Sequence, residues 1–169
     1  QLVIATNAND ILHRCISDND HSKKPLIHSL SPRMDIMVSS NFERMLFVLY
    51  GSDGAAISQL MEDFKSGEMH LREEVLAAAR ETFSSYRLDD DEMIEMIRAV
   101  YEDTEYLLDP HTAIGVKAAR ETRRRQDVPM VCLATAHPAK FPDAVRKAGQ
   151  TEDPVLPHHM LDLFERKEQ

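Results

Sequence analysis

The clearest structural signal in the sequence is the stretch Val131-Cys132-Leu133-Ala134-Thr135-Ala136-His137-Pro138-Ala139-Lys140-Phe141. It begins with an apolar run of strand length, continues as a polar turn and is followed by a helical pattern at 142–147. Strand, turn and helix in this order are typical of an α/β fold, in which ligands bind where a strand ends and the chain turns toward a helix. We therefore expect a buried strand at 131–134 and a functional turn that contains Thr135.

The beginning of the chain repeats this arrangement. Residues 2–5 form a short apolar run, residues 6–10 form a polar turn, and helical character begins at Ile11. If the two apolar runs are parallel strands of one sheet, Thr6 and Thr135 lie at the same edge of that sheet. The alternative is that each threonine only caps the helix that follows it.

The middle of the chain is predicted to be helical. Apolar residues recur at helical spacing in four segments, with capping signals at their ends, at about 41–50, 57–67, 71–83 and 89–101. No strand pattern interrupts residues 40–87. We therefore expect a helical insertion or subdomain at about 52–108 that packs on the α/β part.

Asp109 and Pro110 mark a further helix start. Aspartate is a preferred N-cap residue, and proline suits the first helical position. His111 and Thr112 then lie in the first turn, where free backbone amides could bind an anion. The alternative is a capped surface helix with a solvated histidine.

Composition argues against several classes of protein. The net charge is −9, from 20 basic and 29 acidic residues, which disfavours nucleic-acid binding. Cys15 and Cys132 lack the spacing of a zinc site or of a disulfide framework, and Cys132 falls in the predicted buried strand. The apolar runs are too short to cross a membrane. We expect a cytoplasmic protein with no metal, nucleic-acid or membrane partner.

The first predicted strand begins directly after Gln1, with no residues leading into it. Two strands alone do not make a stable sheet. We therefore expect the chain to be the C-terminal part of a longer protein. The sheet edge at 2–5 would then be open in the isolated chain and would favour self-association.

Specific motifs carry the interpretation further. Taken together and in the same order, they resemble those of the threonine synthase family: IATNANDI at 4–11, SPRMDI at 31–36, SSNFER at 39–44, DPHTA at 109–113 and TAHPAKF at 135–141. The resemblance implies an α/β fold, mostly helical with a few parallel strands, from a pyridoxal-phosphate (PLP) enzyme of fold type II. Residues 1–169 would be the C-terminal portion of its large catalytic domain, with the N-terminal portion absent.

The resemblance also implies an activity. Threonine synthases are PLP-dependent carbon–oxygen lyases that convert O-phospho-L-homoserine and water to L-threonine and phosphate in threonine biosynthesis. The Schiff-base lysine and the glycine-rich loop that holds the cofactor phosphate would lie in the upstream part. The chain would then contain no catalytic residue, and we expect it to be inactive alone.

By the same resemblance, Thr135 is the predicted cofactor-binding residue, whose hydroxyl hydrogen-bonds the pyridine nitrogen and keeps it unprotonated. Further residues are predicted to line or brace the substrate side, where an anionic substrate favours amide and cationic donors: Asn7, Asp10, Ser39, Ser40, Asn41, His137 and Lys140. The competing interpretation is a stand-alone α/β binding or regulatory module without catalysis.

Overall fold

The computed structural model describes residues 1–67, 69–162 and 165–167 of the chain. The described elements follow in the order β1 (Leu2–Thr6), α1 (Ile11–Asp18), η1 (Pro32–Met34), α2 (Ser40–Leu49), α3 (Gly54–Ser66), α4 (Glu73–Thr82), β2 (Phe83–Arg87), α5 (Asp90–Thr104), α6 (Pro110–Thr122), η2 (Pro138–Lys140), α7 (Pro142–Lys147) and η3 (His158–Met160). The predicted class, α/β and mostly helical with parallel strands, is confirmed.

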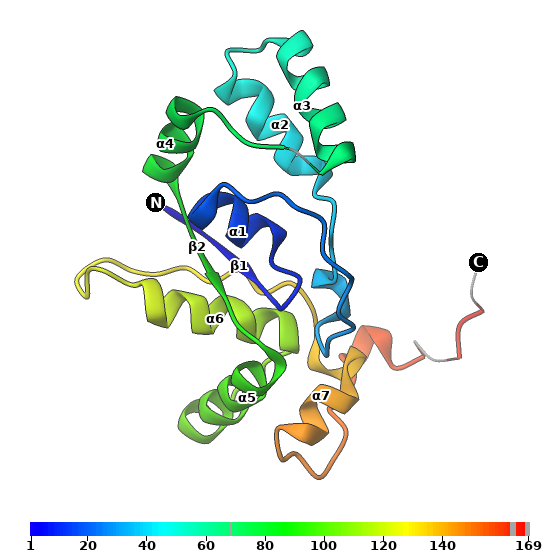
Figure 1. Ribbon diagram of the computed structural model, residues 1–169. Coiled ribbons are helices and arrows are strands. Elements are labelled where there is room, and N and C mark those ends of the chain that lie inside the picture. The colour runs from blue at the N-terminus through cyan, green and yellow to red at the C-terminus, as the bar shows by residue number, and fades with distance from the viewer. Residues whose placement is uncertain (68, 163–164, 168–169) are drawn as a thin grey trace.

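The two strands lie side by side in the middle of the molecule (Figure 1) and are parallel, with register from Leu2 opposite Phe83 to Thr6 opposite Arg87. Helices α1 and α6 each contact both strands. Successive strand side chains point to opposite faces. Ile4 accordingly packs with the core formed by α1–α4, and Ala5 packs with the core formed by α5–α7. The sheet therefore lies between two helical layers.

Strand β2 was not predicted, and the expectation that residues 40–87 contain no strand is wrong. Two serines in its five residues hide the apolar pattern of a strand. One of them, Ser85, faces α1, where its Oγ lies 2.9 Å from Nδ1 of His13. The strand forms because β1, from the beginning of the chain, lies beside it and pairs with its backbone N–H and C=O groups.

The predicted strand at 131–134 is also wrong, since the structure shows no regular secondary structure there. The side chains of Val131 and Leu133 are 80% and 78% exposed, and Cys132 is exposed rather than buried. An extended segment becomes a strand only when a neighbouring strand pairs with its backbone. No such neighbour lies beside this segment among the described residues.

Local signals placed most helix ends correctly. Gly67 ends α3 in the left-handed conformation, with φ of 86°. Asp89 and Glu92 form the capping box that begins α5, and the Asp109 side chain caps α6. At α2 the N-cap residue is Ser39, and its side chain makes no capping hydrogen bond.

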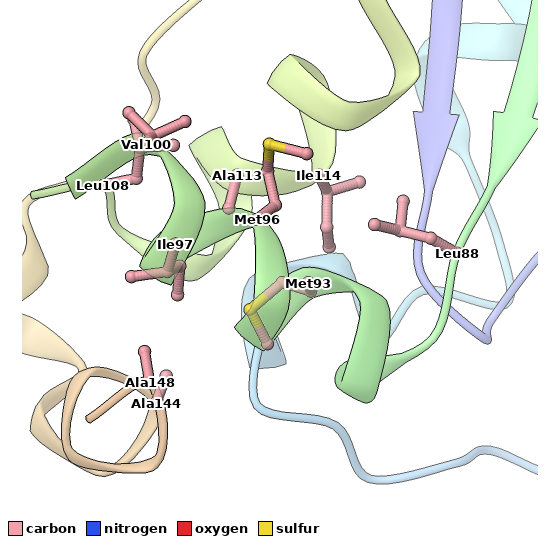
Figure 2. Packing of buried hydrophobic residues seen from close by; sticks show 10 residues of the cluster. All are labelled: Leu88, Met93, Met96, Ile97, Val100, Leu108, Ala113, Ile114, Ala144 and Ala148. Carbon is pink, nitrogen blue, oxygen red and sulfur yellow. The ribbon is translucent and has the colours of Figure 1, made fainter. Parts of the chain in front are cut away.

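Two hydrophobic cores flank the sheet. In the first, residues of α5 pack against α6 and α7. Figure 2 labels Met93, Met96, Ile97 and Val100 of α5, Ala113 and Ile114 of α6, Ala144 of α7 and Ala148 directly after α7. The second core joins α1 to α4 through Cys15, Leu46, Leu60, Leu76 and neighbouring residues. The division at about 52–108 stays a prediction, and within that range α5 packs with the first core.

None of the helices in the described part of the chain combines the length and the apolar character needed to cross a membrane.

Candidate functional site

The turn that follows β1 is organised by Asn7, which is 1% exposed. Its amide nitrogen lies within 2.8–3.0 Å of Ser29 Oγ, Ser31 Oγ and Asp35 Oδ1, so these acceptors share its two hydrogens. Its amide oxygen accepts the backbone N–H of Asn9 at 2.9 Å. Because buried polar groups are costly when unpaired, this network fixes the 29–35 loop beside the end of the strand.

Asn9 attaches the same loop at a second point. Its side chain donates to Ile27 O at 2.8 Å and to Asp35 Oδ1 at 2.9 Å, and it accepts the Ile27 N–H at 2.9 Å. Asp10 has a different partner, because its carboxylate accepts from Nε of the buried Arg14 at 2.8 Å. The polar groups of Asn7 and Asp10 are therefore engaged within the chain.

The second buried polar cluster surrounds Asp109, which is 2% exposed. Its Oδ1 accepts the backbone N–H groups of His111 and Thr112 at 2.9 and 3.3 Å and Nδ1–H of His111 at 3.0 Å. The Thr112 hydroxyl donates to Oδ2. Burial raises the pKa of Asp109, but these hydrogen bonds outweigh burial and lower that pKa below its ordinary value.

His111 is buried, so the alternative of a solvated histidine on a surface helix is wrong. Its Nε2 accepts the backbone N–H of Arg33 at 3.2 Å, and its ring meets the edge of Phe141 with ring centroids 4.5 Å apart. Since one nitrogen donates to Asp109 and the other accepts from Arg33, the ring is the neutral Nδ1–H tautomer. The amides of the first helical turn already bind Asp109 and are not open to an external anion.

The Thr135 turn is attached to the Asp109 cluster. The backbone N–H of Thr135 donates to Thr112 Oγ1 at 3.2 Å, while the rest of Thr135 is exposed. Nδ1 of His137 accepts the N–H of Ala139 at 3.2 Å and so caps η2, on which Lys140 is exposed. A hydrogen-bonded path therefore joins the 29–35 loop to Thr135 through His111, Asp109 and Thr112.

A groove of about 700 Å³ lies between β1, α6 and the extended segment 129–136. Arg33, His111, Gly115 and Thr135 are among the residues that line it. A Cβ atom added to Gly115 would meet no atom within 4 Å, so the groove has room beside α6. A second cavity of about 290 Å³, lined by Asp109, Thr112 and His137 among others, lies beneath the same turn.

The other predicted residues lie elsewhere. Ser39 and Ser40 line a separate cavity of about 100 Å³, and Asn41 is exposed beside them on α2. His21, which was not singled out from the sequence, lines that cavity; it is 4% exposed, and neither ring nitrogen has a hydrogen-bond partner in the described structure. No sequence pattern around His21 signals this burial. The site roles predicted for all eight residues stay predictions.

Metal binding finds no support in the geometry of the described residues, where no three His, Cys, Asp or Glu side chains gather as potential ligands.

The chain is an α/β protein with a parallel sheet between helical layers, and a groove adjoins its polar turns. In such folds ligands bind where strands end. Residues 112–169 match the family model for the threonine synthase C-terminal region. The chain is 55% identical, over 99% of its length, to 36% of threonine synthase from Pseudomonas aeruginosa. It is 42% identical, over 88% of its length, to 34% of the Schizosaccharomyces pombe enzyme.

A solved structure agrees with these sequence matches. PLP-bound threonine synthase from Brucella melitensis superimposes with a TM-score of 0.92 and 49% identity, over 99% of this chain and 36% of that one. The chain is therefore a homologue of the C-terminal segment of threonine synthases, and it spans about a third of the length of the relatives it matches. This finding favours the enzyme-segment interpretation over a stand-alone module.

Proposed function

We propose that the complete protein is a threonine synthase that uses PLP to convert O-phospho-L-homoserine and water to L-threonine and phosphate. This chain would supply the Thr135 side of the cofactor site. The observation that carries the proposal is the placement of Thr135 in a chain that superimposes on a PLP-bound homologue. Thr135 is exposed at a groove, and its backbone N–H donates to the buried Thr112 hydroxyl.

The groove fits the predicted contact with the pyridine ring. Thr135 offers a neutral hydroxyl, and none of the described residues lining the groove carries a carboxylate. A neutral donor leaves a pyridine nitrogen unprotonated, whereas a carboxylate would favour its protonation. Gly115, Ala118 and Ala119 are small, so the α6 side of the groove leaves space for a flat ring.

The residues of this chain would bind and orient rather than react. When bound, PLP supplies the electron sink for the elimination and replacement chemistry. The Thr135 hydroxyl would donate to the pyridine nitrogen and fix the ring at one end. The Schiff-base lysine and the phosphate-binding loop are proposed to come from the upstream part of the protein.

Two substrate-side roles follow from the geometry. Lys140 is exposed on the turn that carries Thr135, and we assign its ammonium group to the anionic substrate. Asn7 is buried with its hydrogen-bonding groups occupied, so we assign it the bracing of the 29–35 loop.

The partner of this chain would be the upstream part of the same polypeptide. Leu2, Val131 and Leu133 are exposed and line the groove, which leaves apolar surface open on both of its sides. We propose that, in the complete protein, an upstream strand fills the part of the groove between Leu2 and residues 131–133 and leaves the Thr135 end of the groove to the cofactor. The isolated chain should then self-associate at high concentration, and sedimentation as a strict monomer would contradict this.

The test uses the complete polypeptide with Thr135→Val, which keeps the shape of the side chain and removes the hydroxyl. The loss of one hydrogen bond should weaken PLP binding by about two- to tenfold, and Thr135→Ser should restore it. Thr122→Val is the matched control, because the Thr122 hydroxyl donates to Ala118 O within α6 and does not line the groove. PLP affinity unchanged by Thr135→Val would exclude the proposed contact.

A further inference from the structure

We propose that Asp109, acting through the Thr112 hydroxyl, is a positioning residue that sets the orientation of Thr135 toward the cofactor. The inference rests on the proposed function, because it gives Thr135 the role of a cofactor contact. It adds two residues that do not touch the cofactor themselves. Asp109 does not line the groove, and Thr112 lies between it and the Thr135 backbone.

The direction of each hydrogen bond is fixed by chemistry. The Thr112 hydroxyl has one hydrogen, and the buried carboxylate of Asp109 can only accept it. A lone pair of the same oxygen is therefore left to accept the backbone N–H of Thr135 at 3.2 Å. Asp109 thus determines which way the hydroxyl points, and the hydroxyl determines where the Thr135 backbone lies.

Helix α6 gives this arrangement a rigid base. Asp109 is its N-cap residue, and Thr112 lies in its first turn, where the Asp109 carboxylate also accepts the Thr112 backbone N–H. Both residues are at most 6% exposed. The Thr135 turn, in contrast, has no regular secondary structure and is exposed. The bond to Thr112 therefore attaches an exposed, irregular segment to the first turn of a helix.

The same carboxylate controls a second loop. Its Oδ1 accepts Nδ1–H of His111, which leaves Nε2 to accept the backbone N–H of Arg33 at 3.2 Å. Arg33, His111 and Thr135 line one groove. One buried anion thus sets the relative position of two loops on either side of the space assigned to the cofactor. Hydrogen bonds weaken steeply with poor geometry, so a small displacement of Thr135 would weaken its contact.

The test compares three single variants in the complete polypeptide. Thr112→Val removes the hydroxyl but keeps the volume, Thr112→Ser keeps the hydroxyl, and Thr122→Val removes a hydroxyl from the other end of the same helix. The readouts are the PLP dissociation constant, the absorption spectrum of bound PLP, and hydrogen–deuterium exchange of a peptide spanning 131–141. Circular dichroism checks that each variant is folded.

Thr112→Val is expected to weaken PLP binding by about two- to tenfold, the effect of one misplaced hydrogen bond. It should also shift the bound-cofactor spectrum and speed exchange at 131–141. Thr112→Ser should behave as the wild type, and so should Thr122→Val. If Thr112→Val does not fold, Asp109→Asn replaces it. The asparagine oxygen can still cap the helix, and its NH2 group, which is a donor, then faces the Thr112 hydroxyl in place of the accepting oxygen.

Two failures are distinguishable. A folded wild-type protein that binds no PLP would contradict the proposed function and, with it, the role of Asp109 toward a cofactor. The positioning role alone would be overturned by a different result. In that case the wild type binds PLP, and a folded Thr112→Val or Asp109→Asn keeps the wild-type affinity, spectrum and exchange. A variant that loses stability but keeps the spectrum would show that the cluster is only structural.

Discussion

Replacing His21 by leucine should change how stability depends on pH. His21 is 4% exposed in an apolar cavity, and its two ring nitrogens have no partner in the described structure. Burial lowers the pKa of His21 from 6.5 to about 4; nearby Asp20 opposes this shift, and Arg14 adds to it. Near neutral pH the folded protein therefore holds an uncharged imidazole.

The sign and size of the effect follow from proton linkage. Between pH 6.5 and about 4 the unfolded chain binds a proton at His21 that the folded chain does not. The free energy of unfolding must then fall as the pH falls through this window, by roughly 3 kcal/mol in total. Below pH 4 both states are protonated, so this contribution no longer changes.

The assay is urea unfolding followed by circular dichroism at several pH values from 4 to 7.5. His21→Leu removes the titration and two unpaired buried nitrogens, so it should be at least as stable as the wild type at pH 7. Its advantage should then grow by roughly 3 kcal/mol toward pH 4. His28→Leu, which removes an exposed histidine, is the control. Parallel curves for wild type and His21→Leu would refute the reasoning.

Three further substitutions test the fold by the same unfolding assay. Ile97→Ala should lower the free energy of unfolding by about 2–5 kcal/mol, because Ile97 is fully buried between helices. The control Val48→Ala, at a 70% exposed position, should lower it by less than about 0.5 kcal/mol, and equal losses would contradict the assigned core. Asp89→Ala removes the capping box of α5 and should cost about 1 kcal/mol, so an unchanged midpoint would argue against that cap. Gly67→Ala places a Cβ on a residue in the left-handed conformation and should lower the free energy of unfolding by about 1 kcal/mol. The control Gly54→Ala should leave it unchanged or raise it, and the reverse order would exclude the described end of α3.

Helix ends could be predicted because their signals are local. The structure confirms three expected helix ends: the start at about 89, the start at Asp109–Pro110 and the stop at about 67. Each depends on a few neighbouring residues. Backbone amides and φ angles at a helix end are satisfied within one turn. Such features need no knowledge of the rest of the fold.

Strands were predicted less well because pairing is not local. The strand expected at 2–5 forms as β1 (Leu2–Thr6), but two other segments were misjudged. Residues 131–134 have the apolar run of a strand but lie exposed, and none of the strands that the structure describes pairs with them. Residues 83–87 have a weak pattern but form a strand because β1 lies beside them. The hydrophobic pattern alone therefore predicted a strand at 131–134 that does not form, and it missed the strand at 83–87 that does.

The candidate site shows the same limit. The motif at 109–113 was noted as a helix start, but its sequence does not reveal that His111 is buried between Arg33 and Asp109. Likewise, Thr135 could be named from its motif, whereas its bond to Thr112 depends on tertiary structure. The sequence could single out these residues, but it could not reveal the hydrogen-bond network that joins them.

The most direct test of the central claim is a product assay on the complete polypeptide supplied with PLP and O-phospho-L-homoserine. We expect L-threonine and inorganic phosphate to form in equal amounts, dependent on PLP, and the isolated 169-residue chain to form neither. A folded, complete polypeptide that binds PLP but releases no threonine, or one that binds no PLP, would contradict the account. Threonine formation by the isolated chain would contradict it as well.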